Sequence, residues 1–170
     1  MKMNKKGFTL IELLAVIVIL AVVALVATPI ILASVENAKK QAAIASANNV
    51  ITAINYNEQM VNFDASTIVG QYTTARASQT TGEGSNAVTT LTDKVSLDSL
   101  NNSSVEYSGD KPSFVDLTFD SNYVVKSGKI NISGYCVAVI NGKAVNSETV
   151  NETVYTTTKG DCPAAAQNNG

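Results

Sequence analysis

The feature that most constrains this chain is an apolar run near its start, from Phe8 to Ala33, interrupted only by Thr9, Glu12, Thr28 and Pro29. As one α-helix this run would span about 39 Å, which exceeds the roughly 30 Å hydrocarbon core of a bilayer. Three lysines precede it within the first six residues. Positive charges on one flank keep that flank in the cytoplasm. We therefore expect a single membrane-spanning helix whose N-terminus stays inside the cell.

An ordinary secretory signal peptide fits this run poorly. The apolar region of such a peptide spans about 7 to 15 residues and ends at a small-residue cleavage site. Here the apolar character resumes after Pro29, and Leu25-Val26-Ala27 is a poor match to such a site. A simple membrane anchor explains the length of the run but not Glu12. A carboxylate costs a few kcal/mol within the bilayer, so its presence indicates a function or a partner.

The segment Lys5-Lys6-Gly7-Phe8-Thr9-Leu10-Ile11-Glu12, followed by a long apolar helix, resembles the class III leader of type IV prepilins. In that family a membrane-embedded peptidase cuts after the glycine and methylates the new amino terminus. The resemblance therefore implies cleavage between Gly7 and Phe8, followed by N-methylation of Phe8. It also implies that the apolar helix stays on the mature protein, unlike a signal peptide.

The resemblance also gives Glu12 a role. Cleavage would create a positive amine on Phe8, and in the family the glutamate pairs with the amine of a neighbouring subunit. Because an unpaired carboxylate in lipid is unfavourable, a subunit gains by docking against one already in the filament. In the monomer, Glu12 could instead snorkel to the cytoplasmic interface, which is compatible with later pairing.

The helix is expected to continue beyond the membrane. The sequence from Ser34 to Met60 lacks Gly and Pro and is rich in Ala, so it favours one helix from about Phe8 to about Gln59. Apolar residues recur on one side at spacings of three and four, which predicts a face buried under a folded domain. This stripe comprises Ile44, Ala47, Ile51 and Ile54. A second face, of Ala38, Ala42 and Ala45, would admit another helix closely.

Pro29 removes one backbone hydrogen bond, so it predicts a kink in the membrane-spanning half. The carbonyl that it frees would be satisfied by Thr28 or by water. By family analogy, the stretch from about Ala21 to Thr28 is expected to unwind when the subunit enters the filament.

Beyond the helix the sequence predicts a small β-rich domain. Thr73 to Thr90 is small and polar and indicates a loop, and Val95 to Leu100 indicates a short helix. Alternating apolar residues after Pro112 predict two strands around a turn at 120–122. Asn141-Gly142 between apolar runs predicts a hairpin, and 150–158 a further strand. The expected fold class is α+β, a long helix packed on an antiparallel sheet of about four strands, as in the pilin fold.

The expected organisation has four parts. Residues 1–7 are the leader that is removed, and 8–33 form the transmembrane half of the helix, which becomes the filament core. Residues 34–60 form its amphipathic half. Residues 61–170 form the globular head with a C-terminal disulfide loop.

The composition excludes several functions. Histidine is absent, and with it the commonest general base and metal ligand. No nucleophile elbow, phosphate loop or zinc-protease motif occurs, so we expect no enzyme, no cofactor and no metal site. The net charge of −2 provides no basic surface for nucleic acid. The two cysteines, Cys136 and Cys162, are expected to form a disulfide in an exported domain, worth about 3 kcal/mol in the chain-entropy model.

The resemblance thus implies a subunit of a type IV pilus, a major pilin in preference to a minor one because Glu12 is present. Its partners would be other copies in a helical filament, the prepilin peptidase, the pilus assembly platform and, as a monomer, the cytoplasmic membrane. The filament would stand on the bacterial surface and serve adhesion, motility, biofilm formation or DNA uptake. Two alternatives stay open: a pseudopilin of a type II secretion or competence system, and a membrane-anchored binding module that does not polymerise.

Overall fold

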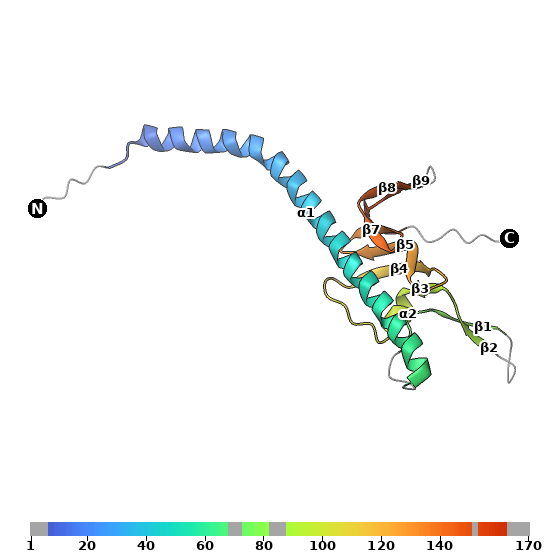
Figure 1. The fold of residues 1–170 in the computed structure, drawn as a ribbon. Helices are drawn as coiled ribbons and strands as arrows, with labels where there is room; N and C mark the ends of the chain where they lie inside the picture. The colour runs from blue at the N-terminus through green and yellow to red at the C-terminus, as the bar shows by residue number, and fades with distance from the viewer. Residues whose placement is uncertain (1–6, 68–72, 82–87, 151–152, 163–170) are drawn as a thin grey trace, which may run out of the picture. The chain divides into compact units, whose positions relative to one another are not determined.

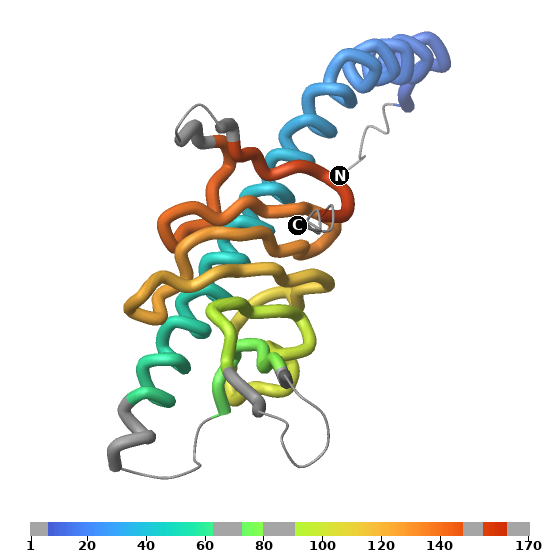
Figure 2. Tube along the Cα trace, turned by 90° about the vertical axis from the view of Figure 1, so that its right-hand side faces the viewer, coloured from blue at the N-terminus to red at the C-terminus, as the bar shows by residue number. Residues whose placement is uncertain are grey.

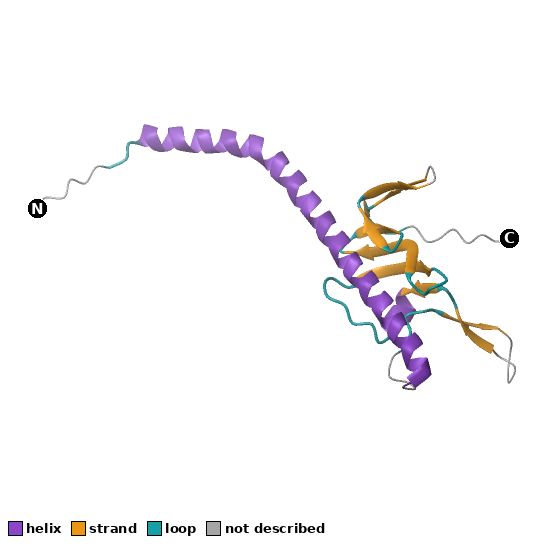
Figure 3. Cartoon of the chain, viewed as in Figure 1, coloured by secondary structure: helices purple, strands orange, loops and turns teal. Residues whose placement is uncertain are grey.

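The computed structural model describes residues 7–67, 73–81, 88–150 and 153–162. It contains a long helix, a short helix and ten strands (Figures 1 and 3). The helices are α1 (Leu10–Thr67) and α2 (Leu97–Asn101). The strands are β1 (Ser78–Thr81), β2 (Val88–Leu91), β3 (Lys94–Ser96), β4 (Pro112–Phe119), β5 (Val125–Ile132), β6 (Tyr135–Ile140), β7 (Lys143–Val145), β8 (Ser147–Val150), β9 (Thr153–Thr156) and β10 (Thr158–Lys159). The chain divides into two compact units, Met1–Lys39 and Lys40–Gly170.

The first unit is the apolar part of α1. Its large hydrophobic side chains, from Phe8 to Val35, are exposed on all sides of the helix, as expected of a segment that lies in lipid. By length and composition α1 can cross a membrane. The helix runs without interruption through Pro29. The Thr28 hydroxyl donates to the carbonyl oxygen of Ala24, at 2.6 Å. Proline at position 29 frees the carbonyl of Leu25, so of the two expected partners, Thr28 and water, Thr28 bonds a different carbonyl.

The second half of α1 buries one face, as the apolar stripe predicts. Ile44, Ala47, Ile51 and Ile54 are buried, whereas Ala42 and Ala45 are exposed on the other face. The helix ends at Thr67, about two turns beyond the expected Gln59. Glu58, which lies just before this added stretch, is fully buried. Nothing in the sequence indicates that this polar side chain would be covered.

The main sheet is antiparallel and covers this half of α1, which confirms the α+β fold. The order is β10-β6-β5-β4-β3, and β7 also pairs with β6. The sheet has six strands where about four were expected, because the short strands β3 and β10, which were not predicted, extend it at its two margins. Aliphatic side chains of the sheet and of α1 form the core. Its largest fully buried members are Ile51, Ile54, Leu117, Ile130 and Ile132.

Three side chains of α1 hold successive levels of the head. Asn48 Oδ1 accepts the backbone N–H of Ala144 at 2.9 Å, and Asn55 Oδ1 accepts that of Val125 at 2.8 Å. One turn further, Glu58 accepts the N–H of Ala75. The strands are therefore stacked along the helix, with β7 nearer residue 40 and the segment before β1 nearer residue 60, as Figure 2 shows.

Gly128 allows β5 and β4 to approach closely. It lies opposite Leu117 with φ of 144°. A Cβ atom at this position would sit 2.1 Å from the carbonyl oxygen of Asp116. Since that neighbour is backbone and cannot move aside alone, only glycine fits here.

The two predicted turns are confirmed. Asn141 and Gly142 have φ of 49° and 74°, the positive values that a tight hairpin between β6 and β7 requires. In the β4–β5 turn, Asp120 Oδ1 accepts the N–H groups of Val124 and Asn122. These hydrogen bonds hold the pKa of the Asp120 carboxyl below its usual value. Tyr123 belongs to this turn, with φ of 58°.

The segments flanking the main sheet differ from expectation. The predicted loop at 73–90 contains β1 and β2, which pair as a two-stranded ribbon; residues 82–87 lie outside the described residues. The strand predicted at 150–158 is β9, which pairs with β8 in a second ribbon instead of joining the main sheet. The short helix α2 is confirmed two residues later than predicted, because Val95 belongs to β3. Threonine-rich strands were missed because they carry little apolar alternation.

Candidate processing and assembly site

The expected cleavage site lies just outside the long helix. Gly7, Phe8 and Thr9 are not helical and are exposed, and α1 begins at Leu10. The Phe8 side chain is 86% exposed. Together with Glu12, these three residues line an open hollow of about 410 Å³. The Gly7–Phe8 peptide is therefore exposed and outside the helix, so a peptidase would not have to unwind a helix to bind it.

The structure adds a partner for Glu12 within its own chain. The backbone N–H and the hydroxyl of Thr9 both donate to Glu12 Oε2, each at 2.8 Å. In return, the Glu12 backbone N–H donates to the Thr9 hydroxyl at 3.3 Å. This reciprocal pair is a capping box, in which Thr9 is the N-cap and Glu12 the third helical residue. The Thr-x-x-Glu spacing was the sequence signal, and our sequence analysis did not use it.

The capping box and the helix dipole both favour the negative charge of Glu12. Both donors reach the same carboxylate oxygen, Oε2, and the side chain lies at the positive end of the helix dipole, where a negative charge is favoured. The uncut chain thus holds the carboxylate in a defined position. Among the residues that the structure describes, Oε1 receives no hydrogen bond. An amine created at Phe8 of another copy is the donor that the prepilin resemblance implies.

The C-terminal cysteines lie within bonding distance. The Sγ atoms of Cys136 and Cys162 are 2.07 Å apart, and 26 positions of sequence separate the two residues. Cys136 is in β6, opposite Thr158 of β10. The disulfide therefore fastens the chain just after β10 to the neighbouring strand β6, and the loop that it closes contains β7, β8, β9 and β10.

A buried ion pair anchors the segment that follows α1. Glu58 is fully buried; its Oε1 accepts from Ala75 N–H and the Thr74 hydroxyl, and its Oε2 lies 2.9 Å from Arg76 Nε. The guanidinium of Arg76 also stacks on the Tyr123 ring, 4.4 Å from its centroid. Nothing in the sequence indicates which of its charged residues pair across this distance, so sequence reasoning missed this cluster.

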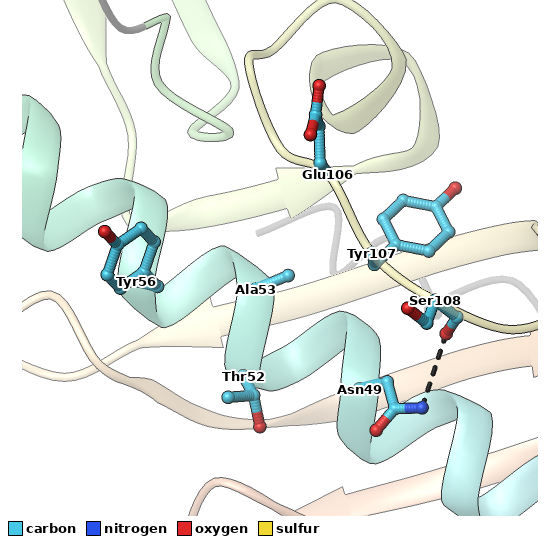
Figure 4. Close-up of a pocket in the computed structure, with 7 residues that line it drawn as sticks. All are labelled: Asn49, Thr52, Ala53, Tyr56, Glu106, Tyr107 and Ser108. Atoms are coloured by element: carbon cyan, nitrogen blue, oxygen red, sulfur yellow. Dashed lines mark hydrogen bonds between the residues drawn. The ribbon is translucent and has the colours of Figure 1, made fainter.

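An open groove of about 830 Å³ lies between α1 and the loop at 106–108 (Figure 4). Asn49 Nδ2 donates to the Ser108 carbonyl at 3.3 Å and ties the loop to the helix. Gly109 approaches the helix so closely that a Cβ atom would sit 2.9 Å from Ser46 Oγ. The side chains that line the groove, among them Tyr56 and Glu106, point in different directions in Figure 4. This arrangement offers no focused set of polar groups for a ligand.

No group of three potential metal-ligating side chains occurs among the residues that the structure describes. Across the same residues, the chemistry-bearing features are therefore the capping box at the start of α1, the disulfide and the buried Glu58–Arg76 pair. The first of these lies beside the Gly7–Phe8 peptide, the predicted cleavage site.

The start of the chain matches a known protein-family motif. Residues 2–28 match the prokaryotic N-terminal methylation motif. The matched segment contains Gly7, Phe8, Thr9 and Glu12, and it ends just before Pro29. No curated protein and no solved structure matches the chain significantly. The motif is that of a class III leader peptide, such as type IV prepilins and pseudopilins carry, and the helix that follows it is long and apolar enough to cross a membrane.

Proposed function

We propose, from the methylation motif at residues 2–28, that this chain is a structural subunit of a type IV pilus, most simply its major pilin. The precursor is held in the cytoplasmic membrane by the apolar part of α1, with its N-terminus inside. The prepilin peptidase cuts between Gly7 and Phe8 and methylates the Phe8 amine. The subunit then passes through the pilus assembly platform into a helical polymer on the bacterial surface.

The observation that carries this proposal is the placement of the motif on the structure. The bond to be cut is exposed and outside the helix, and the carboxylate four residues beyond Phe8 is held by Thr9 through one of its two oxygens. In the polymer, Glu12 of one copy pairs with the Phe8 amine of the next. Because a charged pair in lipid is favourable only when both partners are present, the contact would select a correctly placed neighbour and set the axial register.

In this account α1 has two roles. Its apolar part, residues 8–33, forms the core of the polymer, and a kink at Pro29 shapes the subunit there. Its amphipathic part, residues 34–60, carries the head, residues 61–170, on the outside. The Cys136–Cys162 disulfide fastens the end of the head against the sheet.

The runner-up function is a pseudopilin of a type II secretion or competence system, which carries the same leader. Electron microscopy of cells that express the chain distinguishes the two functions. Long surface fibres that contain the chain support the pilus. Short assemblies confined to the cell envelope, with secretion or DNA uptake lost on deletion, would instead indicate a pseudopilin.

The test of the site uses two substitutions in the full chain, expressed beside a prepilin peptidase and an assembly system. Gly7→Ala should leave precursor of unchanged mass in the membrane. Glu12→Gln keeps an oxygen that accepts from Thr9, so the helix start is preserved, but it removes the charge. It should therefore be processed normally and yield few or no filaments. Normal filament yield from Glu12→Gln would show that the charge is not needed for assembly.

A further inference from the structure

Two ribbons project from the main sheet, and their strands pair only with each other among the strands described. In one ribbon β1 pairs with β2, with Thr80 opposite Thr89. In the other β8 pairs with β9, with Thr149 opposite Val154. Two-stranded ribbons are marginally stable in water, and a third strand adds both hydrogen bonds and packing.

The ribbons lie at opposite ends of the head. β8 follows β7, whose Ala144 is bonded to Asn48 of α1, and β1 follows Ala75, which is bonded to Glu58. These two anchors are almost three helical turns apart on α1. Figures 1 and 2 agree that the β8–β9 ribbon lies near the residue-40 end of this helix segment and the β1–β2 ribbon near the residue-60 end.

The marginal strands of the main sheet and the strands of the two ribbons differ in how they are protected against pairing with another chain. Proteins guard edge strands against pairing with other chains by keeping them short and by placing lysine on them. The short strands at the margins of the main sheet follow this rule, since β3, β7 and β10 each carry one lysine and have at most three residues. The four ribbon strands have four residues each, no lysine and no proline. Glu148 is their single charged residue.

We infer that the β1–β2 ribbon of one copy pairs edge to edge with the β8–β9 ribbon of a second copy of this chain. The inference rests on the proposed polymer and adds a head-to-head contact to the pairing of α1 segments. The two ribbons are different surfaces at opposite ends, so the contact is heterologous and can repeat along an open fibre. Copies stacked along the direction of α1 would bring the β8–β9 ribbon of one head to the β1–β2 ribbon of the next.

Cysteine cross-linking of sheared filaments tests this contact. The only two cysteines of the chain are joined in the disulfide, so introduced thiols report alone. The double variant Thr89→Cys/Thr149→Cys is treated with a thiol cross-linker that spans about 15 Å, or three strand spacings, so the result does not depend on which strand of each ribbon is outermost. We expect a ladder of dimers, trimers and higher multimers from the double variant. Neither single variant should form more than traces of dimer.

The control is Lys129→Cys/Thr149→Cys, since Lys129 is exposed on the central strand β5, which belongs to neither ribbon; it should give no ladder. If the first pair impairs folding, Leu91→Cys/Ser147→Cys places thiols at exposed positions in the same two ribbons. Filaments without a ladder from either ribbon pair would overturn the inference and leave the proposed function standing. Dimers from a single variant would show a symmetric contact and overturn it too. Absence of filaments from the unmodified chain would refute the proposed function itself.

Discussion

Thr9 and Glu12 stabilise the start of α1 together, and this contact separates two roles of the carboxylate. One role is local, since Oε2 completes a capping box within the chain. The other is the proposed pairing with an amine of another copy. The cost of placing Glu12 in lipid is thus partly offset before any neighbour arrives, because two donors already satisfy one of its oxygens.

The local role predicts a difference between Thr9→Val and Thr9→Ser. Valine keeps the branched shape but removes the hydroxyl, which donates to the Glu12 carboxylate and accepts from the Glu12 backbone N–H. Loss of such an N-cap costs about 1 kcal/mol. Amide hydrogen exchange at residues 10–12 should therefore be about fivefold faster in Thr9→Val, while Thr9→Ser should match the unmodified chain. Equal exchange rates in all three proteins would show that the capping box does not stabilise the helix start.

Glu58 is the second residue whose environment makes a quantitative prediction. Glu58→Ala leaves Arg76 without its carboxylate and the Ala75 N–H without its acceptor, and breaking a buried ion pair typically costs about 3–5 kcal/mol. Glu58→Gln keeps one accepting oxygen and should lose less. Urea unfolding of the compact unit Lys40–Gly170 measures both. Losses below about 1 kcal/mol for both variants would mean that the pair is not buried in solution.

At the scale of elements, the disulfide and β10 act together. β10 has only two residues and pairs with β6 at Thr158 and Cys136, so its own hydrogen bonds are few. The disulfide from Cys136 to Cys162 stabilises this pairing, because it lowers the conformational entropy of the unfolded chain. The pairing of β10 with the sheet therefore depends on the two cysteines being oxidised to the disulfide.

This dependence predicts the effect of removing both cysteines. Cys136→Ser/Cys162→Ser should lower the free energy of unfolding by about 3 kcal/mol, a fall in Tm of roughly 10 °C for a domain of this size. The unmodified protein treated with a reductant should melt at the same temperature as this variant. Calorimetry without a difference between the oxidised protein and the serine variant would contradict the prediction.

The elements that could be predicted from the sequence were those with a local signal. The apolar stripe from Ile44 to Ile54 and the Asn141-Gly142 pair each specify a structure within a few residues, and both were confirmed. The β1–β2 ribbon was missed because its strands are polar, so their pairing depends on the chain around them. The Glu58–Arg76 pair was missed because it joins a helix to a loop, and no local pattern in the sequence reveals such a contact.

At the scale of the whole molecule, the chain combines an apolar helix that is exposed on every side with a head that is closed by its own core. The exposed helix needs lipid or other helices around it, and in the proposed function it passes from one to the other. Head contacts through the ribbons would then add to a polymer whose register the Glu12–Phe8 pairing sets.

The most direct test of this account is mass spectrometry of the N-terminus of filaments sheared from cells that express the chain. The account predicts filament subunits that begin with N-methylated Phe8, lack residues 1–7 and retain the whole apolar helix. Subunits that begin elsewhere, an unmethylated full-length chain, or surface filaments that do not contain this chain would contradict it.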